Sequence, residues 1–470
     1  MISKWKKWFK LIGVAILAGI GMVQLVYAVA WAIGNGNNVQ DFYDTGLYLA
    51  NAEKLTCDGW RLIGYSYILR FFMLFKGILG DSYVILLYVA QVVISVVCFA
   101  GGFCSIKYML LGEKITLGKA CIPAIYIVTI PVIWQMQFAI LPDAISLSLV
   151  VLLFAKMSEV FCDYKKFRWD CYLVIVGCLL MLGVMHRHYF YGAILMVLAE
   201  AVILLIRFLI KKYRTAKMFS GMCIVIAMAV LVPIAVKEVN ERVPQEGLYA
   251  TYSIETDLWS RFVYPNLARD HSEYSERVTA IVNDYAVAVC AGTYEYYMNS
   301  IGPMIEINNP EEASEIYLEM VETGWMLHED EMKRGMAKEF VSYLFMPLSM
   351  VKYMYYSGVS LYGHNYTKMH EMSPILTADY MHISMIGFVV VSLIGCSMFL
   401  LWCISEKKVR VRSIFAGLRM TAVMLCITLP MMIFSVARFD YRIGLFSVFM
   451  WAGFALANIC GQRSKGDKCE

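Results

Sequence analysis

The chain has 470 residues, of which 60% are hydrophobic and only 17% are charged, and its formal net charge is +4. A soluble protein of this length needs more polar residues to cover its surface, so this composition excludes an ordinary soluble globular protein. Apolar runs of about 20 residues recur along the chain, and a helix of that length crosses a hydrocarbon core of roughly 30 Å. We therefore expect an all-α polytopic membrane protein, with no nucleic-acid partner.

Ten apolar segments are expected to be membrane helices, because a spanning segment in lipid must pair its own backbone groups. The first follows four lysines and is longer than an ordinary signal-peptide core, so we expect it to remain as an anchor. The first seven form a membrane bundle over residues 1–238, and the last three form a carboxyl-terminal membrane segment over 380–470. The ten segments are 11–33, 82–104, 118–137, 141–160, 171–186, 189–210, 218–237, 381–404, 413–436 and 442–460.

Lysine and arginine are concentrated on one side of this alternating pattern. If the amino terminus is inside, the inner segments hold 23 of the 41 Lys and Arg residues, which is the bias typical of cytoplasmic loops. The segment 239–379 has 21 acidic and 9 basic residues instead. We therefore expect a cell-membrane protein with both termini in the cytoplasm and two long outer loops. These are a first loop over 34–81 and a large acidic, mainly helical loop domain over 239–379, with an interfacial helix within 339–362.

The first outer loop carries two carboxylates just after the first membrane segment. Four residues follow helical spacing and share one face of a helix expected along the membrane surface: Asp44, Tyr48, Ala52 and Leu55. The carboxylate of Asp44 could act as a general base on an acceptor arriving from outside, with Asp41 as a helper one turn earlier. The alternative is an N-cap and a solvated acid on an amphipathic surface helix.

Charged residues also stand at the other outer turns. Asp143 follows Pro142 at the start of the fourth segment, where an acid either stabilises the helix N-terminus or binds an acceptor or a divalent cation. Arginines at outer helix ends could hold a phosphate leaving group in a bidentate geometry, or they could simply extend to the interface. These candidates are Arg187, flanked by His186 and His188, together with Arg438 and Arg442. No spacing specifies a metal, so the metal and the cofactor stay open.

Several of these motifs resemble those of GT-C glycosyltransferases, the group that includes protein O-mannosyltransferases and lipid A aminoarabinose transferases. The run Asp44-x3-Tyr48-x3-Ala52 resembles the Asp-Glu-x2-Tyr-x3-Ala pattern that follows the first membrane helix of that family. Thr45 stands where the second acid of the pattern is common. The resemblance covers essentially the whole chain in layout, with three further short motifs: Leu141 to Asp143, Cys178 to Arg187, and Ala437 to Tyr441.

The resemblance implies an enzyme of the cell envelope that transfers a sugar from a polyprenyl-phosphate donor on the extracytoplasmic face. The acceptor would be a glycan, a lipid or a protein that the sequence does not identify. The resemblance also implies that Asp44 is the catalytic base. The substrate-binding residues would be Asp41, Tyr48, Asp143, His186, Arg187, Arg438 and Arg442.

Two other classes of membrane protein stay open. One is a transporter or flippase of lipid-linked glycans, for which Glu200 is the best argument, because an acid in the middle of an apolar segment is often functional. We interpret Glu200 instead as a packing or protonated residue within the bundle. The other class is a glycan polymerase or ligase, which would rely on arginines near the late loop. Two long outer loops favour the transferase over a carrier, since carriers usually keep their outer loops short.

Overall fold

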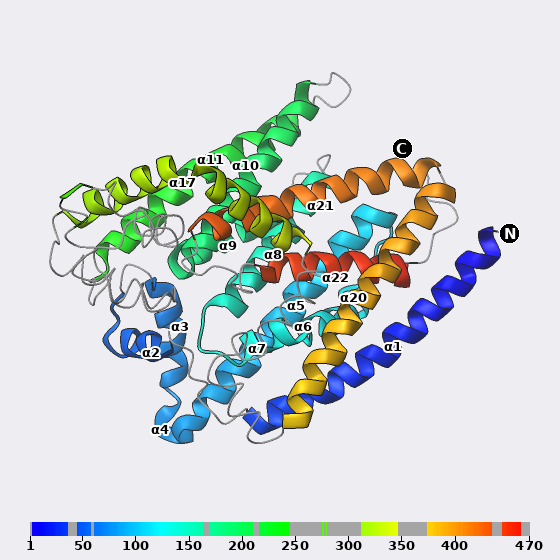
Figure 1. The fold of residues 1–470 in the computed structure, drawn as a ribbon, viewed down its shortest axis with the longest axis horizontal. Helices are drawn as coiled ribbons and strands as arrows, with labels where there is room; N and C mark the ends of the chain where they lie inside the picture. Colours follow the sequence, from blue (N-terminus) through cyan, green and yellow to red (C-terminus); the bar gives the residue numbers. More distant parts are fainter. Residues whose placement is uncertain are drawn as a thin grey trace.

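The chain is built from helices, as the computed structural model shows (Figure 1). Helices account for 91% of the residues that the structure describes, and no strand occurs among them. The all-α expectation is therefore confirmed for this part of the chain. The described residues are 2–35, 45–57, 61–162, 169–209, 216–244, 275–276, 279, 312–345, 374–405, 407–434 and 444–461.

The helices follow the order of the apolar segments, with extra helices in the two expected outer loops. Helices α2, α3 and α4 and a short 3-10 turn belong to the first of these loops, and α17 belongs to the second. The bounds are α1 (Ile2–Asn35), α2 (Thr45–Lys54), α3 (Ile63–Met73), α4 (Lys76–Leu79), η1 (Gly80–Ser82), α5 (Tyr83–Leu111), α6 (Leu117–Val128), α7 (Pro131–Gln137), α8 (Asp143–Cys162), α9 (Trp169–Met185), α10 (Arg187–Leu209), α11 (Ala216–Arg242), α17 (Ala313–Leu344), α20 (Pro374–Ser405), α21 (Lys407–Phe434) and α22 (Leu445–Cys460).

Several helices are long and apolar enough to cross a membrane. Five pass this test within the described residues, and a sixth span results if the bent pair α6 and α7 is counted as one. The chain is thus an all-helical protein with five or six candidate membrane spans, and the expected number of ten is not confirmed. The five are Lys10–Ala30, Lys76–Leu111, Arg187–Ile206, Phe219–Arg242 and Ile383–Ile404; three shorter apolar helices are Trp169–Met185, Ile414–Pro430 and Leu445–Cys460.

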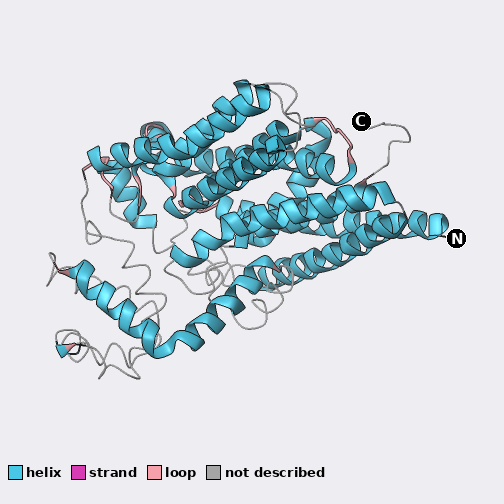
Figure 2. Cartoon of the chain, turned by 90° about the horizontal axis from the view of Figure 1, so that it is seen from above, coloured by secondary structure: helices cyan, strands magenta, loops and turns pink. Residues whose placement is uncertain are grey.

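The long helices run roughly parallel to one another as a bundle (Figure 2). Helix α5 lies inside it and packs against α6, α8, α21 and α22, while α1 lies beside α20 (Figure 1). The amino-terminal helix and the last helix meet at one end of the bundle, where Lys10 Nζ donates a hydrogen bond to the carbonyl of Gly461 at 2.6 Å. The amino terminus and the end of α22 therefore lie on the same side of the bundle.

The expected span over 118–137 is broken rather than straight. Helix α6 ends at Val128, α7 begins at Pro131, and the two axes differ in direction by 97°. Proline disfavours the helical conformation of the residue before it, and Ile130 is extended at φ −61° and ψ 128°. The bend thus has a local cause in the sequence. All seven residues of α7 are buried, so this helix turns into the protein instead of continuing through lipid.

Hydrogen bonds connect α1 with the residues on both sides of the break, and one of them pairs a backbone carbonyl of α6. Gln24 Nε2 donates to the carbonyl of Tyr126 at 2.8 Å and to the hydroxyl of Thr129 at 2.9 Å. Trp134 Nε1 donates in turn to the carbonyl of Ala28 at 3.0 Å. Unpaired backbone groups are strongly unfavourable away from water, so a broken helix needs such partners. The first membrane helix is therefore part of what stabilises the bend.

Helix α17 of the acidic segment ends against the bundle. Trp451 Nε1 of α22 donates to the carbonyl of Leu344 at 2.6 Å, and Tyr343 is fully buried. Trp451 lies six residues into α22, roughly 9 Å along that helix from its first residue. The described part of the expected interfacial helix, 339–345, is thus the end of α17 and is packed on α22. The rest of that expected helix lies outside the described residues.

Glycines allow helices of the bundle to approach closely. At Gly395 of α20, an added Cβ would lie 2.4 Å from the Cα of Ala455 in α22. At Gly102 of α5, it would lie 2.6 Å from the ring of Phe449 in α22. Small residues at helix contacts are a common basis of packing in membranes, where burial of apolar surface adds little. Helix α22 therefore depends on glycines of two neighbouring helices.

We predict that Gly395→Ala destabilises the protein, because backbone atoms of Ala455 cannot move away as a flexible side chain can. Overpacking of this kind typically costs about 1–3 kcal/mol. The measurement is the thermal unfolding midpoint of the purified full chain in detergent. Gly417→Ala in α21 is the matched control, because nothing lies within 4 Å of its added Cβ. Equal midpoints for the two variants would contradict the close contact of α20 and α22.

Candidate functional site

Four of the eight residues proposed from the sequence can be placed. Tyr48, Asp143, His186 and Arg187 belong to the described residues. Asp41, Asp44, Arg438 and Arg442 lie outside them. The expected catalytic base, Asp44, therefore stays a prediction, although helix α2 begins at the next residue of the chain.

Asp143 and His186 are brought together from two turns that are far apart in the sequence. The distance from His186 Nε2 to Asp143 Oδ1 is 3.6 Å, which is an ion pair when the imidazole is protonated. Asp143 is the first residue of α8 and only 2% exposed, and a carboxylate at that position is stabilised by the helix dipole. The pair thus combines an acid and a base that can exchange or hold a proton.

His186 stands at the junction of two helices. Its backbone N–H donates to the carbonyl of Leu182 in α9 at 2.8 Å, and its own carbonyl accepts from Phe190 in α10 at 3.0 Å. Its ring packs edge-on against Tyr189, with ring centroids 4.8 Å apart. Arg187 follows directly as the first residue of α10 and is partly buried. The turn between α9 and α10 thus holds the imidazole in one place while leaving Arg187 part access to solvent.

Helix α2 is buried along one face instead of lying exposed on a surface. Tyr48 is 7% exposed, and both Thr45 and Ala52 are buried with it. Leu55 does not share this face, because α2 ends at Lys54 and Leu55 adopts a positive φ of 56°. The expected continuation of the helical face to Leu55 is therefore wrong. The left-handed backbone there turns the chain away from the helix, a conformation that a branched side chain rarely adopts.

Tyr48 packs against residues of the same outer segment. Its ring meets that of Tyr65 edge-on at a centroid distance of 5.3 Å, and the guanidinium carbon of Arg61 lies 5.9 Å from the Tyr48 centroid. Arg61 is only 6% exposed. A cation over an aromatic face is attracted by the ring quadrupole, so this arrangement retains a positive charge in a buried place. The sequence analysis did not single out Arg61 or Tyr65.

Tyr65 connects this outer segment to Asp143. Burial raises the pKa of the Tyr65 hydroxyl well above its ordinary value, with smaller contributions from Tyr88, Tyr48 and Asp143, while a backbone hydrogen bond with Leu141 opposes the shift. Tyr65 is fully buried, and its neighbour Gly64 allows α3 to approach the end of α9 beside His186. The hydroxyl therefore stays protonated and available as a donor. Tyr48, Tyr65, Asp143 and His186 form the candidate site.

The candidate site has no complete metal centre among the described residues. No group of three or more His, Cys, Asp or Glu side chains there is arranged to hold a metal ion. Asp143 and His186 offer two ligands, and catalytic metal sites commonly use three protein ligands. We therefore assign no metal to this site.

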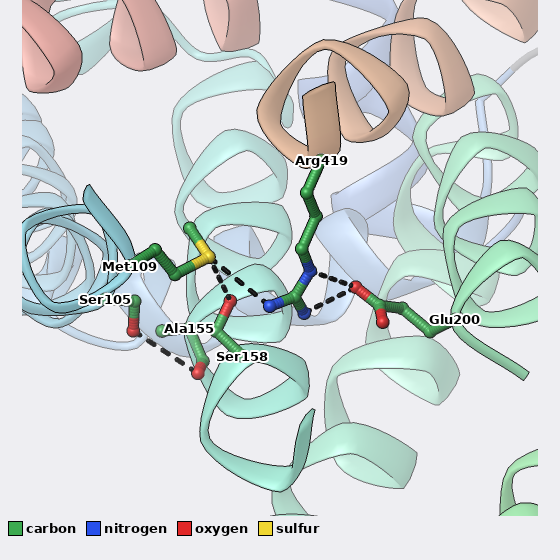
Figure 3. A network of polar contacts seen from close by, with 6 residues as sticks. All are labelled: Ser105, Met109, Ala155, Ser158, Glu200 and Arg419. Atoms are coloured by element: carbon green, nitrogen blue, oxygen red, sulfur yellow. Dashed lines mark hydrogen bonds and ion pairs between the residues drawn. The ribbon is translucent and has the colours of Figure 1, made fainter. Parts of the chain in front are cut away.

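A second polar centre lies deeper in the bundle, around Glu200 (Figure 3). Arg419 Nε donates to Glu200 Oε1 at 2.8 Å, and Arg419 Nη2 donates to the same oxygen. Arg419 Nη1 lies 3.3 Å from the sulfur of Met109, which also accepts from Ser158 at 3.9 Å. These side chains come from α10, α21, α5 and α8. Glu200 is thus an ion-paired residue, which differs from the protonated residue considered from the sequence.

The two polar centres are separate. Glu200 lies 13 residues after Arg187 in α10, which corresponds to about 20 Å along the helix. Arg419 was not singled out because it follows the basic run 407–412 and resembles one more cytoplasmic charge. Its place inside an expected span was the available signal, since a charge at that depth requires a partner.

No family model, curated protein or solved structure matches this chain.

We predict that Arg419→Leu strongly destabilises the protein, because it leaves the charge of Glu200 buried without its cation. Breaking a buried pair in this way typically costs about 3–5 kcal/mol. The double variant Glu200→Leu with Arg419→Leu should regain most of the loss. The thermal unfolding midpoint of the purified protein measures both effects. Glu241→Gln is the control, because it removes the exposed pair of Lys237 and Glu241 and should change little. A midpoint for Arg419→Leu equal to this control would contradict the assignment.

Proposed function

We propose that this chain is a membrane glycosyltransferase that takes a sugar from a polyprenyl-phosphate donor on the extracytoplasmic face. The observation that carries the proposal is the meeting of Asp143 and His186 beside the buried tyrosines of the first outer loop. Those residues come from three corners of the chain that share the layout of GT-C enzymes. The proposal includes the ten-span topology, with both termini cytoplasmic, and Asp44 as general base.

The transfer needs a base and cations in one place. The acceptor oxygen attacks the anomeric carbon, the bond from that carbon to the phosphate oxygen breaks, and polyprenyl phosphate leaves. The acceptor proton passes to the carboxylate of Asp44, and positive charge stabilises the departing phosphate. Arg187, protonated His186 and Arg61 are the described cations near the candidate site, and Arg438 and Arg442 are further candidates from the sequence. Asp143 would orient the acceptor or the imidazole.

The transporter alternative loses its main argument. It depended on Glu200 as an isolated acid that could carry a proton within the membrane. The ion pair with Arg419 supports a structural role for Glu200 instead, because both charges are held by several helices. The polymerase or ligase alternative depends on Arg438 and Arg442, which lie outside the described residues. The transferase is therefore the reading that the candidate site supports best.

We predict that Asp44→Asn abolishes transfer while expression and folding stay normal. Loss of a general base typically lowers the rate by about 10²- to 10⁴-fold. The assay follows release of polyprenyl phosphate from labelled polyprenyl-phosphate mannose and polyprenyl-phosphate aminoarabinose in membranes that contain the protein. Asp81→Asn is the matched control, an exposed carboxylate at the other end of the same expected outer loop. Near-normal transfer by Asp44→Asn would exclude this base, and no release by the unaltered protein from either donor would overturn the proposal.

A second prediction concerns the buried carboxylate of Asp143. Asp143→Asn keeps the size of the side chain but removes the charge beside His186. Opposite charges about 4 Å apart attract by about 1–4 kcal/mol between bulk water and a protein surface, so loss of this attraction should lower kcat/KM roughly 10- to 100-fold. The same release assay measures this effect over a range of donor concentrations. Asp170→Asn, an exposed acid in the first turn of α9, should leave kcat/KM unchanged. An unchanged value for Asp143→Asn would remove Asp143 from the site.

A further inference from the structure

Gln91 is a buried amide within an otherwise apolar membrane helix. It lies in α5, its side chain is fully buried, and its neighbours in the sequence are Ala90 and Val92. A buried amide is unfavourable unless its donors and its acceptor are paired. The N–H and C=O groups of this amide are both paired, and the partners come from two different elements, α3 and the end of α7 with the turn that follows it. Gln91 therefore connects separate parts of the structure in addition to filling space in the core.

The amide nitrogen of Gln91 pairs with the end of α7. Nε2 donates to the carbonyl of Gln137 at 2.8 Å and to the carbonyl of Ala139 at 3.2 Å. The carbonyl of Gln137 is the last of α7 and has no partner within that helix, while Ala139 lies in the buried turn that follows. Ser95, one turn further along α5, donates to Gln137 Oε1 at 2.9 Å. Side chains of α5 therefore bind the end of α7 and the turn after it at two backbone carbonyls and at the side chain of Gln137.

The amide oxygen of Gln91 pairs with the outer segment. Oε1 accepts from the hydroxyl of Tyr65 in α3 at 3.3 Å. Tyr65 in turn packs on Tyr48 and has a backbone hydrogen bond with Leu141, two residues before Asp143. One side chain therefore connects α3, α5 and the turn between α7 and α8.

We propose that Gln91 is a positioning residue that fixes Asp143 relative to Tyr48 and His186. It acts through the turn over 138–142 and through Tyr65, and it does not touch substrate. A role of Gln91 in sugar transfer rests on the proposed function. The structural coupling of the turn over 138–142 to Tyr65 through Gln91 rests only on the contacts of Gln91. Reacting groups must be held within about 0.5 Å of their productive positions, and a buried three-way connection of this kind supplies that constraint.

The coupling can be measured by hydrogen exchange of the full chain in lipid nanodiscs. The probes are the backbone amides of Phe138 and Ala139, which donate within this turn. Gln91→Leu leaves two carbonyls unpaired, so exchange there should become about 10-fold faster. Gln91→Met should behave in the same way, because a thioether has no hydrogen to donate to a carbonyl.

Ser105→Ala is the matched control. Ser105 lies in the same helix, is also buried, and donates to the carbonyl of Ala155 in α8 at 3.4 Å. This variant removes a polar link between α5 and another helix away from the turn, so exchange of Phe138 and Ala139 should stay unchanged. Exchange in Gln91→Leu within twofold of this control would overturn the proposal. That result needs no donor, so it is independent of whether the chain is a transferase.

A second variant keeps the test decisive if Gln91→Leu does not fold. Tyr65→Phe removes the hydroxyl bonds to Gln91 Oε1 and to the backbone of Leu141, and leaves both carbonyl bonds of Gln91 in place. Exchange should accelerate in the α3 amides over 63–73 and stay unchanged at Phe138 and Ala139. No acceleration in α3 would overturn the link to the outer segment.

The transfer assay gives the readout that distinguishes positioning from stability. If the chain transfers sugar as proposed, Gln91→Leu should lower kcat about 100-fold, because a displacement of roughly 1 Å has that effect, and KM should change little. Ser105→Ala should keep both constants. Equal kcat for the two variants would show that Gln91 has no positioning role in transfer, even if exchange is altered.

Discussion

Pairing of backbone groups at the break between α6 and α7 is the constraint on which the rest of the structure depends. A continuous helix would satisfy its own carbonyls and N–H groups in lipid, but Pro131 prevents continuity and the chain turns by 97°. Gln24 then pairs the carbonyl of Tyr126 at the end of α6, Trp134 of α7 donates to the carbonyl of Ala28 in α1, and Gln91 pairs the carbonyls of Gln137 and Ala139. Helix α1 is thereby joined to both arms of the bend, and α5 is joined to the turn that precedes Asp143.

The two polar centres differ in how far they are open to solvent. The ion pair of Glu200 and Arg419 is enclosed by four helices, and its charges are both nearly inaccessible. Such a pair stabilises mainly by requiring that α10 and α21 stay in register, since desolvation offsets much of its attraction. The pair of Asp143 and His186 is different, because His186 remains partly exposed beside Arg187. A partly open acid and base suit proton transfer and binding of an anionic group.

The outer segments belong to the membrane body and are not independent of it. Tyr48 and Tyr65 are buried in the first loop, and the end of α17 is hydrogen-bonded to Trp451 of α22. Helix α2 buries one face, with Tyr48 packed on Tyr65 of α3, and leaves its other face exposed. The candidate site therefore forms where helices of the first loop pack against the bundle.

Hydropathy and charge in the sequence determined the helical class, the candidate spans and the segments that carry acids, because those properties depend on composition within about 20 residues. The sequence analysis treated 118–137 as one span from its apolar run and did not single out Pro131, at which the structure begins a new helix. The partners of Asp143, Glu200 and Gln91 came only from the tertiary structure. His186, Arg419 and the carbonyl of Gln137 lie 43, 219 and 46 residues away. Pairings at such separations depend on how helices pack, which no local pattern of residues encodes.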